Sequence, residues 1–203
     1  MENQKLKKTA IFTMVPFIKK ELELSGYHVE ISYKDDKTVQ SAMIKFSNLM
    51  YEAGLSGLKG QKISVKLEID TNPPQWAEFS AKIVNKYFPL SFLVYDLPFL
   101  FAGKMHAVLT RRYSKGRDFY DIFWYLSRMK DIEPDITFLT NALKQTGWDK
   151  AMPSEDNWRG YLQRVVEGVN WDTVNKDVEN FLERPADMKV FTKENLLEVI
   201  SQK

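Results

Sequence analysis

Residues 98–126, PFLFAGKMHAVLTRRYSKGRDFYDIFWYL, contain two amphipathic helical patterns joined by a short basic hinge. In the first pattern, Lys104 and Arg111 fall at i and i+7 and so share one helical face. Three further cations, Arg112, Lys115 and Arg117, lie at the junction with the second pattern. The hinge is Ser-Lys-Gly at 114–116. In the second pattern, apolar residues from Phe119 to Leu126 keep helical spacing. The stretch predicts a helical hairpin, around which we interpret the rest of the chain.

The charged side chains of this hairpin allow two interpretations. Lys104, Arg111 and Arg117 are cations, while Asp118 and Asp121 share one face of the second helix at i, i+3. Lysine as a point charge and arginine as a bidentate fork suit phosphate, and the start of a helix adds free N–H groups. The cluster therefore predicts either a cradle for a triphosphate or an ion-pair network that braces two helices.

Composition bounds the class of protein. The chain has 203 residues, 44% of them hydrophobic and 13% aromatic, which suffices for a packed core. A formal net charge of +2 does not suggest a protein that coats nucleic acid. The absence of cysteine excludes disulfides, thiolate metal sites and a cysteine nucleophile, and two histidines argue against a His-rich zinc site. We find no signal peptide or transmembrane segment and expect a cytoplasmic protein.

The N-terminal half predicts a helix followed by strands. Residues 9–25 keep helical spacing, and 27–33 and 40–46 alternate as the two strands of a hairpin. Residues 62–70, KISVKLEID, alternate cleanly between apolar and polar side chains, and 90–95 form a shorter apolar strand.

Glu68 and Asp70 project from the same face of strand 62–70, with side chains about 6 to 7 Å apart. Two carboxylates so placed are hard oxygen ligands suited to Mg²⁺. The alternative is a solvated strand face on which Lys66 offsets the two acids. The pattern alone leaves both interpretations open.

The C-terminal half reads as helical throughout. The expected helices span 136–145, 155–167, 171–182 and 194–200. The predicted fold class is α+β, with an α+β core at 1–97 and a helical region at 98–203 that carries the charged hairpin and a C-terminal bundle. His106, within the first helix of the hairpin, is interpreted as a packed or partner-bound histidine.

The hairpin resembles a known family. Lys104, Ala107, Arg111 and the block RDFYD at 117–121 resemble the K…A…R…RDxxD signature of the AbiEii/AbiGii toxins. These are nucleotidyltransferase-fold proteins of bacterial abortive-infection and type IV toxin–antitoxin systems. The strand in KLEIDTNPP is similar to the family's strand that carries a third metal-binding carboxylate.

The resemblance implies a fold, an activity and partners. It implies a mixed sheet with flanking helices and a helical C-terminal region. The implied activity is transfer of a nucleotide from an NTP, with Mg²⁺, to an acceptor such as RNA, including tRNA ends. An antitoxin protein is the implied partner.

It also implies residue roles. Glu68 and Asp70 would bind the metal, and Lys104 would hold the triphosphate with support from Arg111 and Arg117. Asp118 and Asp121 would orient these cations or take part in catalysis.

One departure from the family bears on activity. Family members carry an earlier Gly-Ser loop followed by an acidic pair that supplies the first two metal carboxylates, and no Gly-Ser dipeptide occurs in this chain. We therefore expect a truncated enzyme, one part of a split enzyme or a decayed relative, with weak or absent activity alone. The alternative is a non-catalytic module that binds an antitoxin or a complementary fragment. An unpaired sheet edge also predicts self-association into a homo-oligomer.

Overall fold

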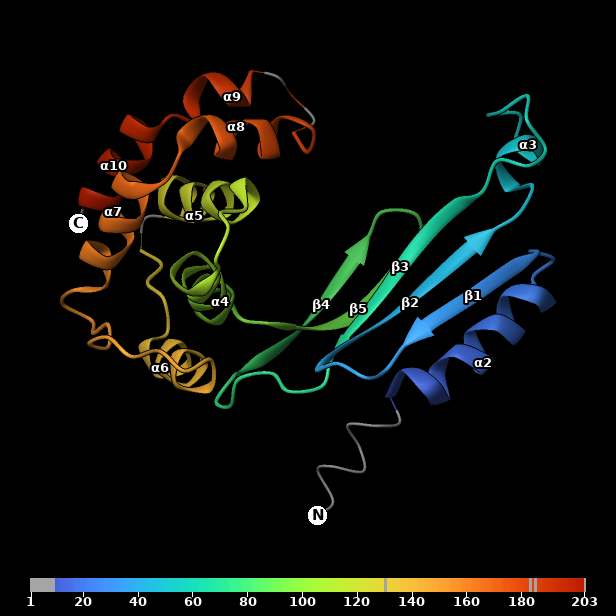
Figure 1. The fold of residues 1–203 in the computed structure, drawn as a ribbon, viewed down its shortest axis with the longest axis horizontal. Coiled ribbons are helices and arrows are strands. Elements are labelled where there is room, and N and C mark those ends of the chain that lie inside the picture. Colours follow the sequence, from blue (N-terminus) through green and yellow to red (C-terminus); the bar gives the residue numbers. More distant parts are fainter. Residues whose placement is uncertain (1–9, 130, 183, 185, 203) are drawn as a thin grey trace, which may run out of the picture. The chain divides into compact units, whose positions relative to one another are not determined.

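The computed structural model describes residues 10–129, 131–182, 184 and 186–202. The chain divides into two compact units, 1–73 and 74–203. Helices and antiparallel strands occur together, which confirms the α+β class (Figure 1). Within the described ranges, no helix has both the length and the apolar character needed to cross a membrane.

The first unit is a three-stranded antiparallel sheet with one helix on its face. Its elements are α2 (Ala10–Leu24), β1 (Val29–Lys34), β2 (Val39–Phe46), the short α3 (Leu49–Glu52) and β3 (Ile63–Asp70). The strand order is β1-β2-β3. The helix and all three strands lie within two residues of their predicted bounds.

Helix α2 ends and packs as its sequence dictates. Gly26 adopts a φ of 87°, and Tyr27 N–H donates to Leu22 O at 3.0 Å, which closes the helix in a Schellman turn. On the sheet side, Ile11 and Val15 of α2 pack against Ala42 of β2. This cluster is the small core of the first unit.

The apolar side of β3 is buried only in part. Leu67 and Ile69 pack against the core of this unit, whereas Ile63 is 40% and Val65 50% exposed. The reason is that α2 packs on β1 and β2, as Figure 1 shows, and leaves the start of β3 uncovered. Clean alternation placed these side chains on one face but did not determine what covers that face.

The second unit begins with a β-hairpin and continues as helices. Strand β5 (Pro89–Tyr95) lies near its predicted position and pairs with β4 (Phe79–Asn85), which the sequence did not predict because Lys82 and Asn85 interrupt its apolar pattern. The Phe79 and Tyr95 rings stack across this hairpin with centroids 4.6 Å apart. The predicted division at residue 97 follows β5, whereas this hairpin belongs to the same compact unit as the helices.

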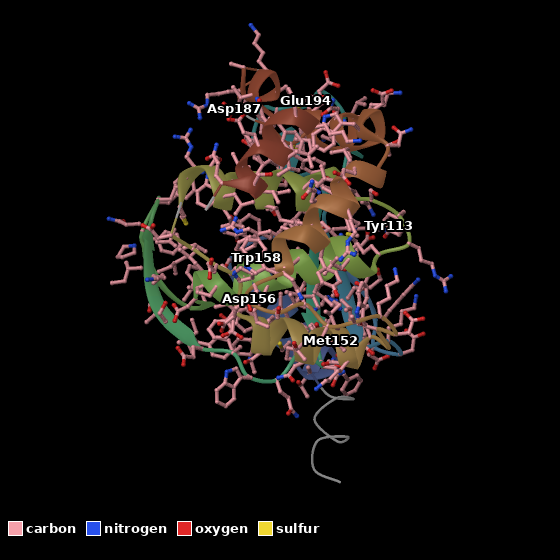
Figure 2. All side chains as sticks on the ribbon, turned by 90° about the vertical axis from the view of Figure 1, so that its left-hand side faces the viewer. Tyr113, Met152, Asp156, Trp158, Asp187 and Glu194 are labelled. Carbon is pink, nitrogen blue, oxygen red and sulfur yellow. The ribbon has the colours of Figure 1, made fainter. Side chains whose placement is uncertain are left out.

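The helices of the second unit enclose the main core. They are α4 (Leu97–Thr110), α5 (Gly116–Arg128), α6 (Ile136–Gln145), α7 (Trp158–Gly168), α8 (Trp171–Glu179), the short α9 (Asp187–Val190) and α10 (Lys193–Ser201). Trp158, labelled in Figure 2, is 1% exposed, and its ring meets that of Phe101 edge to face. All predicted helices of this half are present, and α4 and α5 form the expected hairpin.

Candidate functional site

Helices α4 and α5 bring the predicted charged residues together. Lys104 Nζ lies 3.1 Å from Oδ1 of Asp118 and 2.5 Å from Oδ2 of Asp121. The other oxygen of Asp118, Oδ2, pairs with the Arg111 guanidinium. Asp118 of α5 therefore joins Lys104 of α4 to Arg111, which follows the last residue of α4 and has an extended backbone.

A glycine sets the position of this cluster. Gly116 is the first residue of α5, and a Cβ added to it would lie 2.7 Å from Val178 Cγ2 and closer still to the Val174 carbonyl oxygen. Both contacts are closer than atoms of these types can approach. The start of α5 therefore packs directly on the backbone of α8, and this close packing requires the missing side chain.

Burial differs sharply within the cluster. Asp118 is 5% exposed, whereas about a third of the Lys104 and Arg111 side chains remains accessible. A buried carboxylate needs compensating charge, and both oxygens of Asp118 have it. The side chain of Asp121 is 40% exposed, so its ion pair with Lys104 lies at the protein surface.

The charge state of Lys104 follows from these contacts. Burial alone lowers the pKa of Lys104, but the hydrogen bond and attraction from Asp121, followed by those from Asp118, outweigh burial and raise it above 10.5. Lys104 is therefore an ammonium at neutral pH. It can hold an anion but cannot accept a proton from an attacking group.

A pocket of about 450 Å³ opens beside these residues. Cations from α4, the hinge and α5 line it together with the two aspartates and with apolar side chains near the end of α8. The lining residues are Lys104, Arg111, Lys115, Arg117, Asp118, Tyr120, Asp121, Val178, Phe181 and Leu182. The structure thus gathers Lys104, Arg111, Arg117, Asp118 and Asp121 around one concavity.

Two of the cations have no carboxylate partner in the described part of the chain. The Arg117 guanidinium lies 4.2 Å from the centre of the Phe181 ring, and Lys115 Nζ lies 5.8 Å from that of Tyr113. Neither forms an ion pair with a described residue. An aromatic face orients a cation without neutralising its charge.

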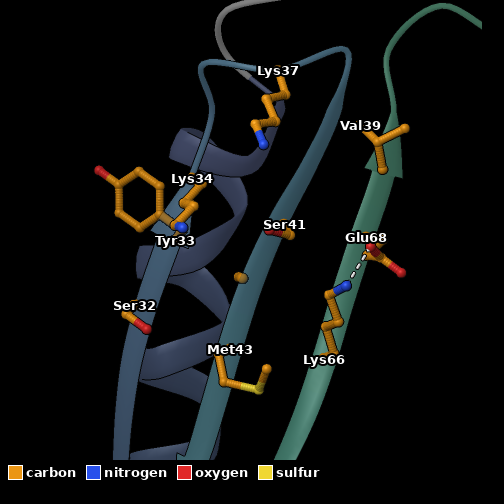
Figure 3. Close-up of a pocket in the computed structure, with 10 residues that line it drawn as sticks. Ser32, Tyr33, Lys34, Lys37, Val39, Ser41, Met43, Lys66 and Glu68 are labelled. Carbon is orange, nitrogen blue, oxygen red and sulfur yellow. Dashed lines mark ion pairs between the residues drawn. The ribbon is translucent and has the colours of Figure 1, made fainter.

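Glu68 and Asp70 belong to the first unit. As predicted, both lie on the polar face of β3, where Glu68 Oε1 is 2.6 Å from Lys66 Nζ and Asp70 Oδ1 accepts from the Asn72 N–H at 2.9 Å. Figure 3 shows Glu68 and Lys66 at an open pocket of about 460 Å³, to which Lys34 and Lys37 also contribute.

The fit of this face to Mg²⁺ is incomplete. Among the described residues, no group of three or more Asp, Glu, His or Cys side chains is placed to hold a metal ion. Mg²⁺ requires six oxygen ligands in near-octahedral geometry. Glu68 and Asp70 can supply two of them at most without water and a bound phosphate, so they do not form a metal site by themselves.

His106 is a packed residue. Its Nε2 lies 3.0 Å from Thr146 Oγ1, and that hydroxyl donates to the carbonyl oxygen of Ala142. Burial first, and then the nearby Arg111 charge, lowers the pKa of His106 below 6.5. We therefore assign His106 a place in the junction of α4 and α6 and no part in the charged pocket.

The sequence interpretation missed the apolar wall of the pocket. Phe181 keeps helical spacing with Val174 and Val178, which is typical of a core residue, yet it is 56% exposed. A third pocket, of about 500 Å³, was also not predicted; it contains Trp148 and Tyr161, whose polar ends both donate to Ala151 O. Periodicity marks such aromatics as apolar but does not show which of them line a concave surface.

Comparison with known proteins gives a match to a protein family. A family model described as "Nucleotidyl transferase AbiEii toxin, Type IV TA system" matches residues 13–194. No curated protein and no solved structure matches the chain. The matched region includes both β3 and the α4–α5 hairpin.

Proposed function

The chain belongs to the AbiEii family of nucleotidyl transferase toxins of type IV toxin–antitoxin systems, and on that premise we propose that it binds an NTP and transfers a nucleotide to an acceptor such as RNA or tRNA. The observation that carries the proposal is the pocket at the α4–α5 hairpin, which holds four cations against two carboxylates. An excess of positive charge in a concave site favours a polyanion.

The two interpretations of the hairpin, brace and cradle, combine in this site. Asp118 has both oxygens occupied by Lys104 and Arg111, so we assign it the role of positioning these cations. Lys115 and Arg117 are available to bind phosphate. The first turn of α5 adds N–H groups that no side chain caps, at the positive end of the helix dipole.

We propose that Lys104 and Asp121 act on the triphosphate itself. Lys104 keeps its positive charge and can offset the charge that develops on phosphate oxygens during transfer. Asp121 is the more exposed carboxylate and is proposed either to orient Lys104 or to interact directly with the acceptor group.

Mg²⁺ remains part of the proposal as the ion that accompanies a triphosphate. Glu68 and Asp70 are its proposed protein ligands, with Glu68 exchanging Lys66 for the metal. When bound, the ion would neutralise phosphate charge. Because the 203 residues contain no Gly-Ser dipeptide, we expect the transfer activity of this chain alone to be weak.

The experiment measures NTP binding and transfer separately. Binding of labelled NTPs should weaken about tenfold in Arg117→Ala, the order of magnitude of one charge-assisted contact. The matched control is Arg164→Ala, which removes an arginine stacked 4.5 Å from the Tyr161 ring, outside this pocket. Equal affinities in the two variants, or no NTP binding by the wild type, would refute the pocket assignment.

Transfer is tested by incubating the chain with labelled NTPs, Mg²⁺ and bulk tRNA. We expect low incorporation that disappears in Glu68→Ala/Asp70→Ala. Robust incorporation by that double variant would show that these carboxylates are not the metal ligands.

A second candidate function rests on a different observation. Strands β4 and β5 expose large apolar side chains, among them Ile83 at 74% and Leu93 at 77%. Surfaces of this kind bind proteins, so the alternative is a non-catalytic module for an antitoxin or a complementary fragment. The test is co-expression of the chain with a candidate antitoxin. A stable complex, together with no NTP binding, would favour the non-catalytic module. In both cases we propose a cytoplasmic location, where NTPs and tRNA occur.

A further inference from the structure

Strand β3 has one free edge. Within the described ranges it pairs with β2 alone, and it ends the sheet order β1-β2-β3. Every side chain from Ile63 to Lys66 is exposed. Natural sheets protect such an edge, since its unpaired backbone groups invite another strand.

The backbone shows which residues face that edge. Thr71 N–H donates to Thr38 O at 3.0 Å, in continuation of the β2–β3 register. In an antiparallel ladder, alternate residues direct both backbone groups to the same neighbour. Ile63, Val65, Leu67 and Ile69 therefore bond to β2. The residues between them, Ser64, Lys66, Glu68 and Asp70, present N–H and C=O to the free edge.

We propose that this edge pairs antiparallel with the same edge of a second copy, with Leu67 on the two-fold axis. In this register Lys66 lies opposite Glu68 of the second copy, and Ser64 lies opposite Asp70 of the second copy. The symmetry repeats each pair. The ladder spans residues 64–70 of both strands and leaves no outward backbone group of these residues unpaired.

The charges on β3 favour this register over the registers whose axis lies on an adjacent residue. Moving the axis to Lys66 places two Lys66 side chains opposite each other, and moving it to Glu68 does the same for two glutamates. Like charges directly opposite each other destabilise a ladder. An axis on Val65 avoids the repulsion but shortens the ladder to residues 63–67. The register centred on Leu67 is therefore the longest of those that place no like charges opposite each other.

Both faces of the joined sheet agree with this arrangement. On the polar face, Lys66 and Glu68 already reach each other within one chain at 2.6 Å, as Figure 3 shows, so a partner strand would extend that pair into a ladder. On the apolar face, Val65, now 50% exposed, would lie beside Ile69 of the second copy. Pairing thus covers a side chain that α2 leaves uncovered. This pairing of strands is independent of the proposed function.

The test is the mass of the full chain by light scattering and sedimentation over a wide concentration range. We expect the mass to rise from 23.7 kDa toward twice that value as concentration increases. Lys66→Glu alone and Glu68→Lys alone should each raise the dissociation constant about tenfold or more, because symmetry turns two attractive pairs into two repulsive ones. Mixing the two variants should restore the dimer, since each Glu then faces a Lys.

Two further variants separate the edge from general effects. Ser64→Pro removes an N–H that points outward, which an edge strand tolerates, so the variant should stay folded by circular dichroism but lose the dimer. Lys45→Glu makes the same charge change on the inner strand β2 and should leave the dimer intact. Mass is the readout because Glu68 is also a proposed Mg²⁺ ligand.

A wild type that remains a monomer at all concentrations would overturn the proposal. So would a dimer that survives Ser64→Pro, or a mixture of the charge variants that stays monomeric. A mass equal to one copy plus a different chain would show that another protein binds this edge, and this result would also overturn the proposed homodimer.

Discussion

Asp118 is the residue that holds the charged hairpin together. It is 5% exposed and pairs with Lys104 through one oxygen and Arg111 through the other. With these cations committed to Asp118, Lys115 and Arg117 remain for a ligand. The ion-pair brace is thus present in the structure, while phosphate binding by Lys115 and Arg117 stays a prediction.

Replacing Asp118 with Asn should destabilise the protein by about 2 to 4 kcal/mol, since it leaves cations without their buried partner. The matched control is Asp121→Asn, which removes an exposed carboxylate from the same lysine and should cost less than about 1 kcal/mol. Urea unfolding measures both changes. Equal losses in the two variants would contradict the difference in burial.

His106 should make stability depend on pH. Folding lowers the pKa of His106 below the value of 6.5 that it has in the unfolded chain. Between the folded and the unfolded pKa, the unfolded chain binds more protons, so the free energy of unfolding rises with pH. The contribution of His106 is fully present above 6.5 and is lost as pH falls through the folded pKa. His106→Gln should flatten this dependence in urea titrations between about pH 5 and 7.5. An unchanged slope would show that another group is responsible.

At the scale of elements, the contact between α5 and α8 positions the pocket. The start of α5 touches the backbone of α8 at Gly116, and Arg117, the next residue, lies over Phe181, just beyond the end of α8. The cations of the hinge and the apolar wall beyond α8 are therefore held in place by one close approach between two helices.

Gly116→Ala should push these helices apart and cost about 1 to 3 kcal/mol, the usual range for overpacking. Gly103 provides the control because it lies inside α4 with nothing within 4 Å of an added Cβ. Gly103→Ala should stabilise the protein by about 0.5 to 1 kcal/mol through helix propensity. Thermal unfolding distinguishes the two, and a stabilising Gly116→Ala would disprove the close contact.

At the scale of the whole molecule, the two units have very different cores. The second unit buries a large aromatic and aliphatic cluster that includes Phe101, Phe119 and Trp158. The cluster in the first unit consists of Ile11, Val15 and Ala42, with three partly buried neighbours. Stability scales with apolar area removed from water, so most of it belongs to the helical unit.

Hydrogen exchange on the intact chain should show this inequality. Amides of α4 and α5 are expected to exchange slowest, at rates set by global unfolding, and amides of β1 to β3 are expected to exchange faster through local opening. Mass spectrometry of peptic peptides resolves the two units. Protection of β1 to β3 equal to that of α4 would contradict the prediction. Because dimer formation through β3 could also protect these strands, the measurement is repeated with Ser64→Pro.

The sequence by itself determined the local structure and supplied the candidate site residues. Helical periodicity around 98–126, strict alternation at 62–70 and the glycine at 26 act over a few residues, so the α4–α5 hairpin, β3 and the end of α2 could be predicted. The same local order placed Lys104 on α4, Arg111 just beyond the end of α4 and Asp118 on α5.

Only the tertiary structure decided which side chains are buried and which line the pocket. Strand β4 forms because it pairs with β5, and Val65 is exposed because α2 covers other strands. Phe181 is exposed just beyond the end of α8, where its ring lies against Arg117. Each outcome depends on a contact between segments distant along the chain. A periodic pattern records how one element faces its surroundings, whereas the packing of several elements determines what those surroundings are.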